Sequence, residues 1–310
     1  MVEELMQEMV VLYCFLMIGF VMAKFRVLSN RANQVLAKLI LNITLPALII
    51  FSLYIPFSFA MLKEFSWLIG MSLYILSLSI VLAKWMGKRL HHIEERRSVY
   101  ESLIIFGNQG FIGYAVIYAL FAEDGIVYLA VFNIIYLLLI WTYGIYLFNK
   151  NERLFQAKRL LNPGLTSTLI GIVFFLLPVP LPSFAIYVLE DVGKMTIPLS
   201  MMFIGSLLAS EQLKGLIKLS KDTFLWKAAW MKLLLIPILI LVFALLSVPK
   251  HLILIAAIVS GMPSAPTISL YAQEFGGDAL YAATGVFLST ALCMITIPSL
   301  IILIHMLIGI

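Results

Sequence analysis

The 310-residue sequence is short of charge: only 12% of its residues are Asp, Glu, Lys or Arg, against about 25% in a typical soluble domain. Hydrophobic residues make up 63%, and the mean hydropathy is +1.06. This composition excludes a water-soluble protein and leaves no room for a soluble domain of useful size. A spanning helix needs about 20 apolar residues, so with connections of about ten residues the chain accommodates roughly ten spans.

Cysteine is also scarce, because Cys14 and Cys293 are the only two and both lie in apolar runs. This excludes a disulfide framework and a cysteine metal site. HExxH, GxSxG and paired aspartates for diphosphate binding are missing as well, so we expect no metal, no cofactor and no enzymatic activity. The N-terminus lacks both the positive region and the cleavage site of a signal peptide, so we expect the first helix to be retained.

The apolar runs and their polar interruptions predict an all-α membrane protein with ten transmembrane helices. The connections are short, so consecutive helices should be antiparallel neighbours. The predicted segments are residues 5–24, 34–55, 64–84, 98–121, 126–148, 161–180, 185–209, 225–247, 252–273 and 280–306.

The basic residues are distributed very unevenly among the connections. Of 21 Lys and Arg residues, 17 lie in or beside the first, third, fifth and seventh connections, whereas the opposite side has only Lys63 and Lys250. Lys194 and Lys232 fall within spans. Cytoplasmic loops carry the Lys and Arg excess, so we predict a multi-pass protein of the cell (inner) membrane with both termini outside. The net charge of +5 thus marks topology, and no nucleic acid partner is expected.

The two halves of the chain share landmarks. Residues 19–51 align without a gap on residues 171–203, with six identities in 33 positions. The sequence TLP at 44–46 meets TIP at 196–198, each inside the second helix of its half. A repeat with an odd number of spans must insert upside down relative to its partner. We therefore predict two inverted five-helix repeats, residues 1–150 and 151–310.

Glycine and proline interrupt the fourth helix of each half. Residues 104–116 read IIFGNQGFIGYAV, and residues 258–270 read IVSGMPSAPTISL. Glycine frees the backbone, and proline removes a donor and clashes with the preceding turn. One such cluster would more often reflect close helix packing. Two of them, placed alike in both halves and each with polar side chains, favour broken helices around a transporter site.

Broken helices at membrane depth offer binding groups of both signs. Each second half presents free N–H groups and a positive dipole end, which suit an anion such as a carboxylate, while the preceding halves expose carbonyls that suit a cation. We expect the substrate to contact residues at the two breaks, namely Asn108, Gln109, Gly110, Ser264, Pro266 and Thr267. Asn42 and Asn133, also within spans, either contact the substrate or hydrogen-bond one helix to another.

Acid–base pairs within the spans are few. Lys194 has Glu190 one turn earlier and Asp191 nearby. The Glu190–Lys194 pair either couples ion movement to transport or neutralises itself while Lys194 extends to the outer surface. Lys232 is expected to extend to the membrane surface in the same way. The third segment has no acidic residue, so no carboxylate for proton transfer can be nominated.

Five motifs occur in order along nearly the whole chain: NITLPALIIFSLY at 42–54, FGNQGFIGY at 106–114, NPGLTSTLIGIVF at 162–174, TIPLSMMFIGSLLA at 196–209 and MPSAPTISLYAQEFGGD at 262–278. As a set they resemble the auxin efflux carrier family, which includes the plant PIN proteins and many bacterial permeases. The long hydrophilic central loop of many plant members is absent. The chain therefore resembles the short, bacterial type.

The resemblance implies a fold like that of the sodium/bile acid symporters, with helices four and nine crossing at the substrate site. It implies elevator-type alternation between a transport bundle and a scaffold, interleaved across both repeats, and often a homodimer formed through the scaffold. It also implies organic anion substrates such as indole acetate, malate or malonate. The family's polar position in the fourth helix maps onto Asn108, and its ninth-helix proline maps onto Pro263 or Pro266.

The function that these observations predict is secondary active transport of a small organic anion. A sodium-coupled organic anion symporter of the same fold is an alternative, although no acid is available near the crossover. A non-transporting membrane sensor is a second alternative, although such proteins usually carry a signalling domain. Acidic coupling residues described for some plant members have no clear counterpart here, so proton and sodium coupling both stay open.

Overall fold

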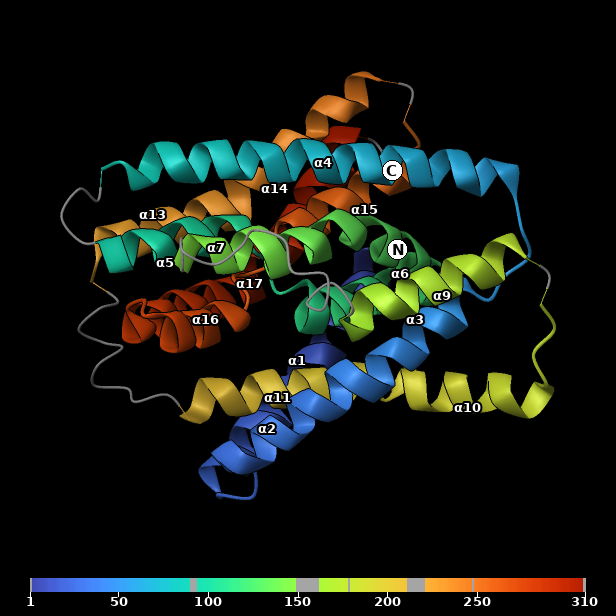
Figure 1. Cartoon of the computed structure of the whole chain (residues 1–310), viewed down its shortest axis with the longest axis horizontal. Coiled ribbons are helices and arrows are strands. Elements are labelled where there is room, and N and C mark those ends of the chain that lie inside the picture. The colour runs from blue at the N-terminus through green and yellow to red at the C-terminus, as the bar shows by residue number, and fades with distance from the viewer. Residues whose placement is uncertain are drawn as a thin grey trace. The chain divides into compact units, whose positions relative to one another are not determined.

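A computed structural model describes residues 2–89, 94–148, 162–177, 179–210, 221–246 and 248–308, which are almost entirely helical (Figure 1). Five helical stretches are long and apolar enough to cross a membrane, and three shorter helices are also apolar. The five are Arg31–Leu53, Phe59–Gly87, Gln109–Phe148, Thr223–Leu245 and Ala279–Leu307. The prediction of an all-α membrane protein is therefore confirmed, whereas the count of ten spans and the inverted repeat stay predictions.

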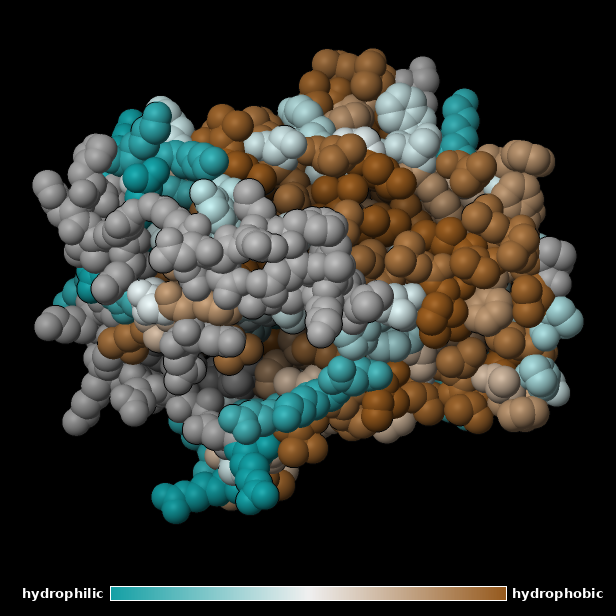
Figure 2. All heavy atoms as spheres, in the orientation of Figure 1, coloured by the Kyte–Doolittle hydropathy of each residue, from teal (hydrophilic) through white to brown (hydrophobic). Residues whose placement is uncertain are grey.

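The surface of the described residues is unusually apolar. Figure 2 shows apolar residues over a broad part of the face in view. Large side chains such as Phe59, Leu245 and Met306 are at least 75% exposed. Exposed apolar surface on this scale is unfavourable in water and suits contact with lipid. The basic residues Lys150, Arg153, Lys158, Arg159, Lys214 and Lys218, on which part of the orientation prediction rests, lie outside the described residues.

The chain forms two compact units, each of which takes segments from both halves of the sequence. The first unit contains the described residues within Met1–Ser66, Gly110–Ile134 and Leu161–Glu211, and the second contains those within Trp67–Gln109, Ile135–Leu160 and Gln212–Ile310. The proposed repeat boundary near residue 150 is a different division, and it stays a prediction.

The first unit is a bundle of mostly apolar helices. Ser29 and Asn162 start α2 and α9, because their side-chain oxygens accept hydrogen bonds from the backbone N–H groups of Ala32 and Leu165. The helices are α1 (Val2–Lys24), α2 (Asn30–Leu39), the π-helix η1 (Ile40–Thr44), α3 (Leu45–Leu53), most of the π-helix η2 (Gln109–Gly113), the first part of α6 (Tyr114–Leu139), α9 (Pro163–Leu176), α10 (Ser183–Lys194) and α11 (Thr196–Ser210).

Glycine lets two helices of this unit touch at the backbone. A Cβ atom at Gly205 of α11 would overlap the Leu16 carbonyl of α1, and one at Gly19 of α1 would overlap the Met202 carbonyl of α11. Such reciprocal contacts through small residues are typical of helix pairs in membranes. The α1–α11 pair is therefore a fixed element of the first unit.

The second unit contains most of the long helix α4, from Trp67 onward, and the C-terminal helices. Its most deeply buried helix is α15, in which every residue from Leu252 to Ser260 is buried. The helices are α4 (Phe59–Gly87), α5 (Glu94–Ile105), the last part of α6, η3 (Ile140–Gly144), α7 (Ile145–Phe148), α13 (Thr223–Trp230), η4 (Met231–Leu235), α14 (Ile236–Leu239), the 3-10 helix η5 (Ile240–Leu245), α15 (Lys250–Ser260), α16 (Thr267–Phe275) and α17 (Ala279–Ile308).

The boundary expected between the fourth and fifth predicted segments lies inside α6. Ala122 has φ 50° and ψ −144°, which turns the chain sharply between the two parts of this helix. A positive φ is unfavourable for alanine because its Cβ crowds the backbone. Glycine is the usual residue for such a backbone conformation, and position 122 is alanine. The sequence therefore predicted only the approximate position of the turn, between residues 121 and 126.

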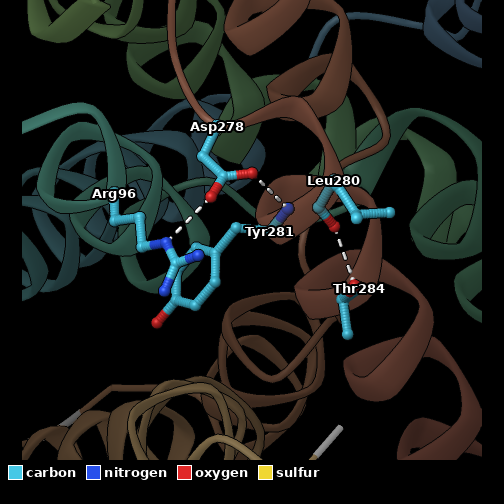
Figure 3. Close-up of polar contacts among 5 residues, drawn as sticks. All are labelled: Arg96, Asp278, Leu280, Tyr281 and Thr284. Carbon is cyan, nitrogen blue, oxygen red and sulfur yellow. Dashed lines mark hydrogen bonds and ion pairs between the residues drawn. The ribbon is translucent and has the colours of Figure 1, made fainter. Parts of the chain in front are cut away.

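An ion pair joins the starts of two helices in the second unit (Figure 3). Arg96 of α5 donates from Nε to Asp278 at 2.8 Å, and the other Asp278 oxygen accepts from the backbone N–H of Tyr281 at 2.9 Å. The Arg96 guanidinium also lies 5.2 Å from the ring centroid of Tyr281. Asp278 therefore caps α17 and fixes its start against α5.

Candidate functional site

The two interrupted segments meet in the second unit, where an antiparallel bridge pairs Gly107 with Ser264. The N–H of Asn108 donates to the Pro263 carbonyl at 2.6 Å, and the N–H of Ala265 donates to the Phe106 carbonyl at 3.0 Å. Helix α5 ends at Ile105, and α15 ends at Ser260. The glycine and proline clusters thus do break both helices, and the breaks lie against each other.

Local chemistry explains both breaks. Pro263 and Pro266 have no N–H, so they cannot continue the hydrogen bonding of α15. The gap at residues 261–266 is followed directly by α16, which begins at Thr267. In the other segment, Gly107 gives room for a close neighbour, since a Cβ there would lie 3.2 Å from the Cε and Nζ atoms of Lys232.

The carbonyl groups left at the end of α5 are bonded to donors from elsewhere in the unit. The Ser264 hydroxyl donates to the Leu103 carbonyl at 2.8 Å. The Tyr136 hydroxyl donates to the Gly107 carbonyl at 2.6 Å. The Lys232 ammonium lies 3.3 Å from the Ile105 carbonyl. Side chains from three other segments therefore hold this broken end in place.

Ser264 has a structural role that was not predicted. Besides the bond from its hydroxyl, its backbone N–H donates to the Ser289 hydroxyl of α17 at 3.0 Å. Its two bonds hold the break between α15 and α16 against α5 and α17, and the prediction that Ser264 lines a substrate site stays a prediction. A substrate would have to compete with these bonds to reach its hydroxyl.

Asn108 and Gln109 follow the bridge and are almost fully buried, with exposed fractions of 2% and 3%. The Gln109 Oε1 atom has no hydrogen-bond partner in the described part of the chain. A buried polar atom without a partner is unfavourable by about 1–3 kcal/mol, so a polar ligand or water is expected beside it. Pro266 and Thr267, at the start of α16, are half-buried.

The remaining predicted residues belong to the first unit. Asn133 is buried, and its Oδ1 atom has no hydrogen-bond partner among the described residues. The Asn42 side chain is exposed and donates to the Lys38 carbonyl of its own chain segment at 2.8 Å. Gly110 is half-buried, with the side chain of Leu41 as the nearest group to a Cβ placed there.

Lys194 lies at the end of α10 in the first unit, with 42% of its side chain exposed. Its ammonium is 2.6 Å from Glu190 and 3.6 Å from Glu123. Glu123 also accepts a hydrogen bond from the Tyr118 hydroxyl at 3.1 Å. The contact between Glu123 and Lys194 could not be predicted, because the two residues are far apart in the sequence. The Glu190–Lys194 pair follows from helical spacing.

Lys232 contradicts the prediction that it extends to the membrane surface. It is only 2% exposed, and its ammonium points to the end of α5. The residue is the second of the π-helix η4, directly after the regular helix α13. Counting helical turns from the basic end of the segment estimates depth and does not show which side of the helix faces other helices, so it gave the wrong environment.

The first unit also contains an open cavity of about 600 Å³ between the ends of α3 and α9. Its lining is mostly apolar, and it includes the aromatic residues Tyr54, Phe57, Phe174 and Phe175. None of Asn42, Gly110 and Asn133 lines it. The cavity therefore adds no support to the predicted polar contacts of this unit.

Comparison with known proteins identifies the family. The profile of a family described as membrane transport protein matches residues 4–301. A search of curated proteins found no match. The family match includes both broken segments and all eight residues predicted to contact the substrate. Because it covers almost the whole chain, the protein belongs to this family of membrane transport proteins, which is that of the auxin efflux carriers.

Proposed function

We propose that this membrane transport protein is a secondary active transporter of a small organic anion, most simply a mono- or dicarboxylate of the auxin, malate or malonate kind. The observation that carries the proposal is the backbone bridge between Gly107 and Ser264, which brings together two broken helices. Broken helices that start inside the membrane direct free N–H groups and positive dipole ends towards an anionic ligand.

The proposed substrate contacts in the second unit are Asn108, Gln109 and the start of α16 at Pro266 and Thr267. Asn108 and Gln109 are buried amides, which can donate hydrogen bonds to a carboxylate from their NH₂ groups. Gly110, Ser264, Asn42 and Asn133 remain candidate contacts. The hydrogen bonds of Ser264 and Asn42 favour structural roles for these two residues.

We further propose elevator-type alternating access, with the unit that contains the bridge acting as the transport bundle, and a homodimer formed through the scaffold. These proposals rest on the family. Glu190 and Lys194 are the proposed coupling pair, and their salt bridge would break and reform as an ion moves. The sodium-coupled symporter and the non-transporting sensor remain the alternatives to be separated by experiment.

Ligand-induced stabilisation of the purified protein tests the substrate class. A carboxylate at one hundred times its Kd should stabilise the folded state by about 2.7 kcal/mol, which raises the melting temperature. Monocarboxylates and dicarboxylates should be compared with neutral amides of the same shape. Uptake of the stabilising compound into proteoliposomes then separates a transporter from a sensor. A panel in which only uncharged compounds stabilise the protein would contradict the proposal.

A further inference from the structure

Lys232 is a buried lysine, and no buried carboxylate of the described residues lies beside it. Its side chain is 2% exposed, and no carboxylate of the described residues lies within the 4.0 Å of an ion pair. An unpaired buried charge is strongly unfavourable unless polar groups replace its lost water. The surroundings of the ammonium therefore show what keeps it there.

Those surroundings are the carbonyl end of a helix. The Lys232 ammonium is 3.3 Å from the carbonyl oxygen of Ile105, the last residue of α5. The C-terminal end of a helix carries a partial negative charge, which stabilises a cation placed against it. Gly107 provides the space, because a Cβ atom there would crowd both Cε and Nζ of the lysine.

Three neighbouring carbonyl groups already accept hydrogen bonds from the protein. The Leu103 carbonyl accepts from the Ser264 hydroxyl, the Phe106 carbonyl from the Ala265 N–H, and the Gly107 carbonyl from the Tyr136 hydroxyl. In transporters with broken helices, the unwound carbonyls and the C-terminal helix ends are the groups that coordinate a coupling Na⁺. Here, donors of the protein itself are bonded to the carbonyls of Leu103, Ile105, Phe106 and Gly107.

We propose that the Lys232 ammonium is a resident cation, which takes at the end of α5 the place that a coupling Na⁺ would occupy. It balances the carbonyl end of α5 permanently. The bridge between Gly107 and Ser264 then forms without external sodium. A further consequence rests on the proposed anion transport: carboxylate binding at the bridge is independent of sodium.

The test measures the melting temperature of the purified full-length protein without substrate, in sodium chloride and in choline chloride of the same ionic strength. Equal ionic strength removes general screening from the comparison. Wild-type protein should melt at the same temperature in both salts. The Lys232→Ala variant should melt lower in choline, and small cations such as Na⁺, Li⁺ or NH₄⁺ should recover at least about half of the loss by binding in the space left by the side chain.

Two further variants control the result. Lys232→Met fills the space without a charge, so its melting temperature should not respond to the choice of cation. Lys88→Ala removes an exposed lysine from the second unit and should behave as the wild type does in this comparison. Sodium stabilisation of the wild type overturns the proposal and needs no variant. A Lys232→Ala protein that melts alike in both salts also overturns it.

The same samples separate this inference from the proposed function. Carboxylates added in choline should raise the wild-type melting temperature as much as they do in sodium. A rise that requires sodium would overturn the resident cation. A protein that no carboxylate stabilises in either salt would count against the proposed substrate class, while the salt comparison without substrate would still decide the role of Lys232.

Discussion

The phenolic O–H of Tyr136 donates a hydrogen bond to the carbonyl oxygen of Gly107 at 2.6 Å, and both residues are buried. This bond holds the break of α5 from the side of α6. Tyr136→Phe should leave the carbonyl without its donor and destabilise the protein by about 1–3 kcal/mol. Tyr74→Phe is the matched control, since Tyr74 is 36% exposed. Equal melting temperatures for the two variants would show that the bond contributes nothing.

The glycine contacts between α1 and α11 predict a sharp difference between two glycine variants. Gly205→Ala places a Cβ against the Leu16 carbonyl, which cannot move without separating the helices. We expect a loss of about 3 kcal/mol or more, seen as a low melting temperature or poor recovery of folded protein. Gly70→Ala in α4 meets no atom within 4 Å and should be neutral or slightly stabilising.

Asn108 is the most specific of the proposed substrate contacts. Asn108→Asp keeps the size of the side chain but adds a negative charge, so it should reduce carboxylate transport at least about tenfold, equivalent to about 1.4 kcal/mol. Asn108→Ala should also lose transport, while both proteins remain folded in detergent. Ser299→Ala, at an exposed position, controls for handling of the variants. Undiminished flux in both Asn108 variants would refute the assignment.

The Asp278 carboxylate has two bonds that can be separated by substitution. Asp278→Asn keeps the cap on α17 but removes the ion pair with Arg96. Because the Arg96 and Asp278 side chains are 31% and 23% exposed, we expect the free energy of unfolding to fall by at most about 1 kcal/mol. Asp278→Ala also removes the cap and should lose about 1 kcal/mol more. Combining each variant with Arg96→Ala in a double-mutant cycle measures the interaction energy between residues 96 and 278. Equal effects of the two substitutions would contradict a capping role.

The orientation of the chain can be tested with single cysteines in a background that lacks Cys14 and Cys293. Both Lys63 and Lys88 are exposed, and they lie before and after the predicted third span. Lys63→Cys should react with an impermeant maleimide in intact cells. Lys88→Cys should react only after the membrane is opened, because the basic side is expected to be cytoplasmic. The reverse pattern would invert the predicted topology.

Local chemistry made parts of this structure predictable. The glycine and proline clusters located the breaks between Ile105 and Gln109 and between Ser260 and Thr267, because these residues act on the backbone where they stand. The crossing of the two segments was expected from the family resemblance. The pairing of Gly107 with Ser264 depends on contacts between distant segments, which no local pattern contains.

The side-chain environments were harder to predict for the same reason. Lys232 was assigned to the surface by counting helical turns, a count that does not show that its side chain faces the end of α5. The donors Tyr136 and Ser264 become recognisable only once the carbonyls that they bond have been located. Glu123 directly follows the turn at Ala122 and lies near Lys194, which is about 70 residues away along the chain, so no local pattern pairs them.

The bridge between Gly107 and Ser264 is made by main-chain N–H and C=O groups alone. Its two hydrogen bonds do not depend on which side chains are carried by Asn108 or by Thr267 at the start of α16. Substitutions at these positions can therefore alter ligand preference while the crossing is preserved. Substrate preference can therefore change in evolution while the crossing stays the same. The same positions offer a starting point for engineering the selectivity of the protein.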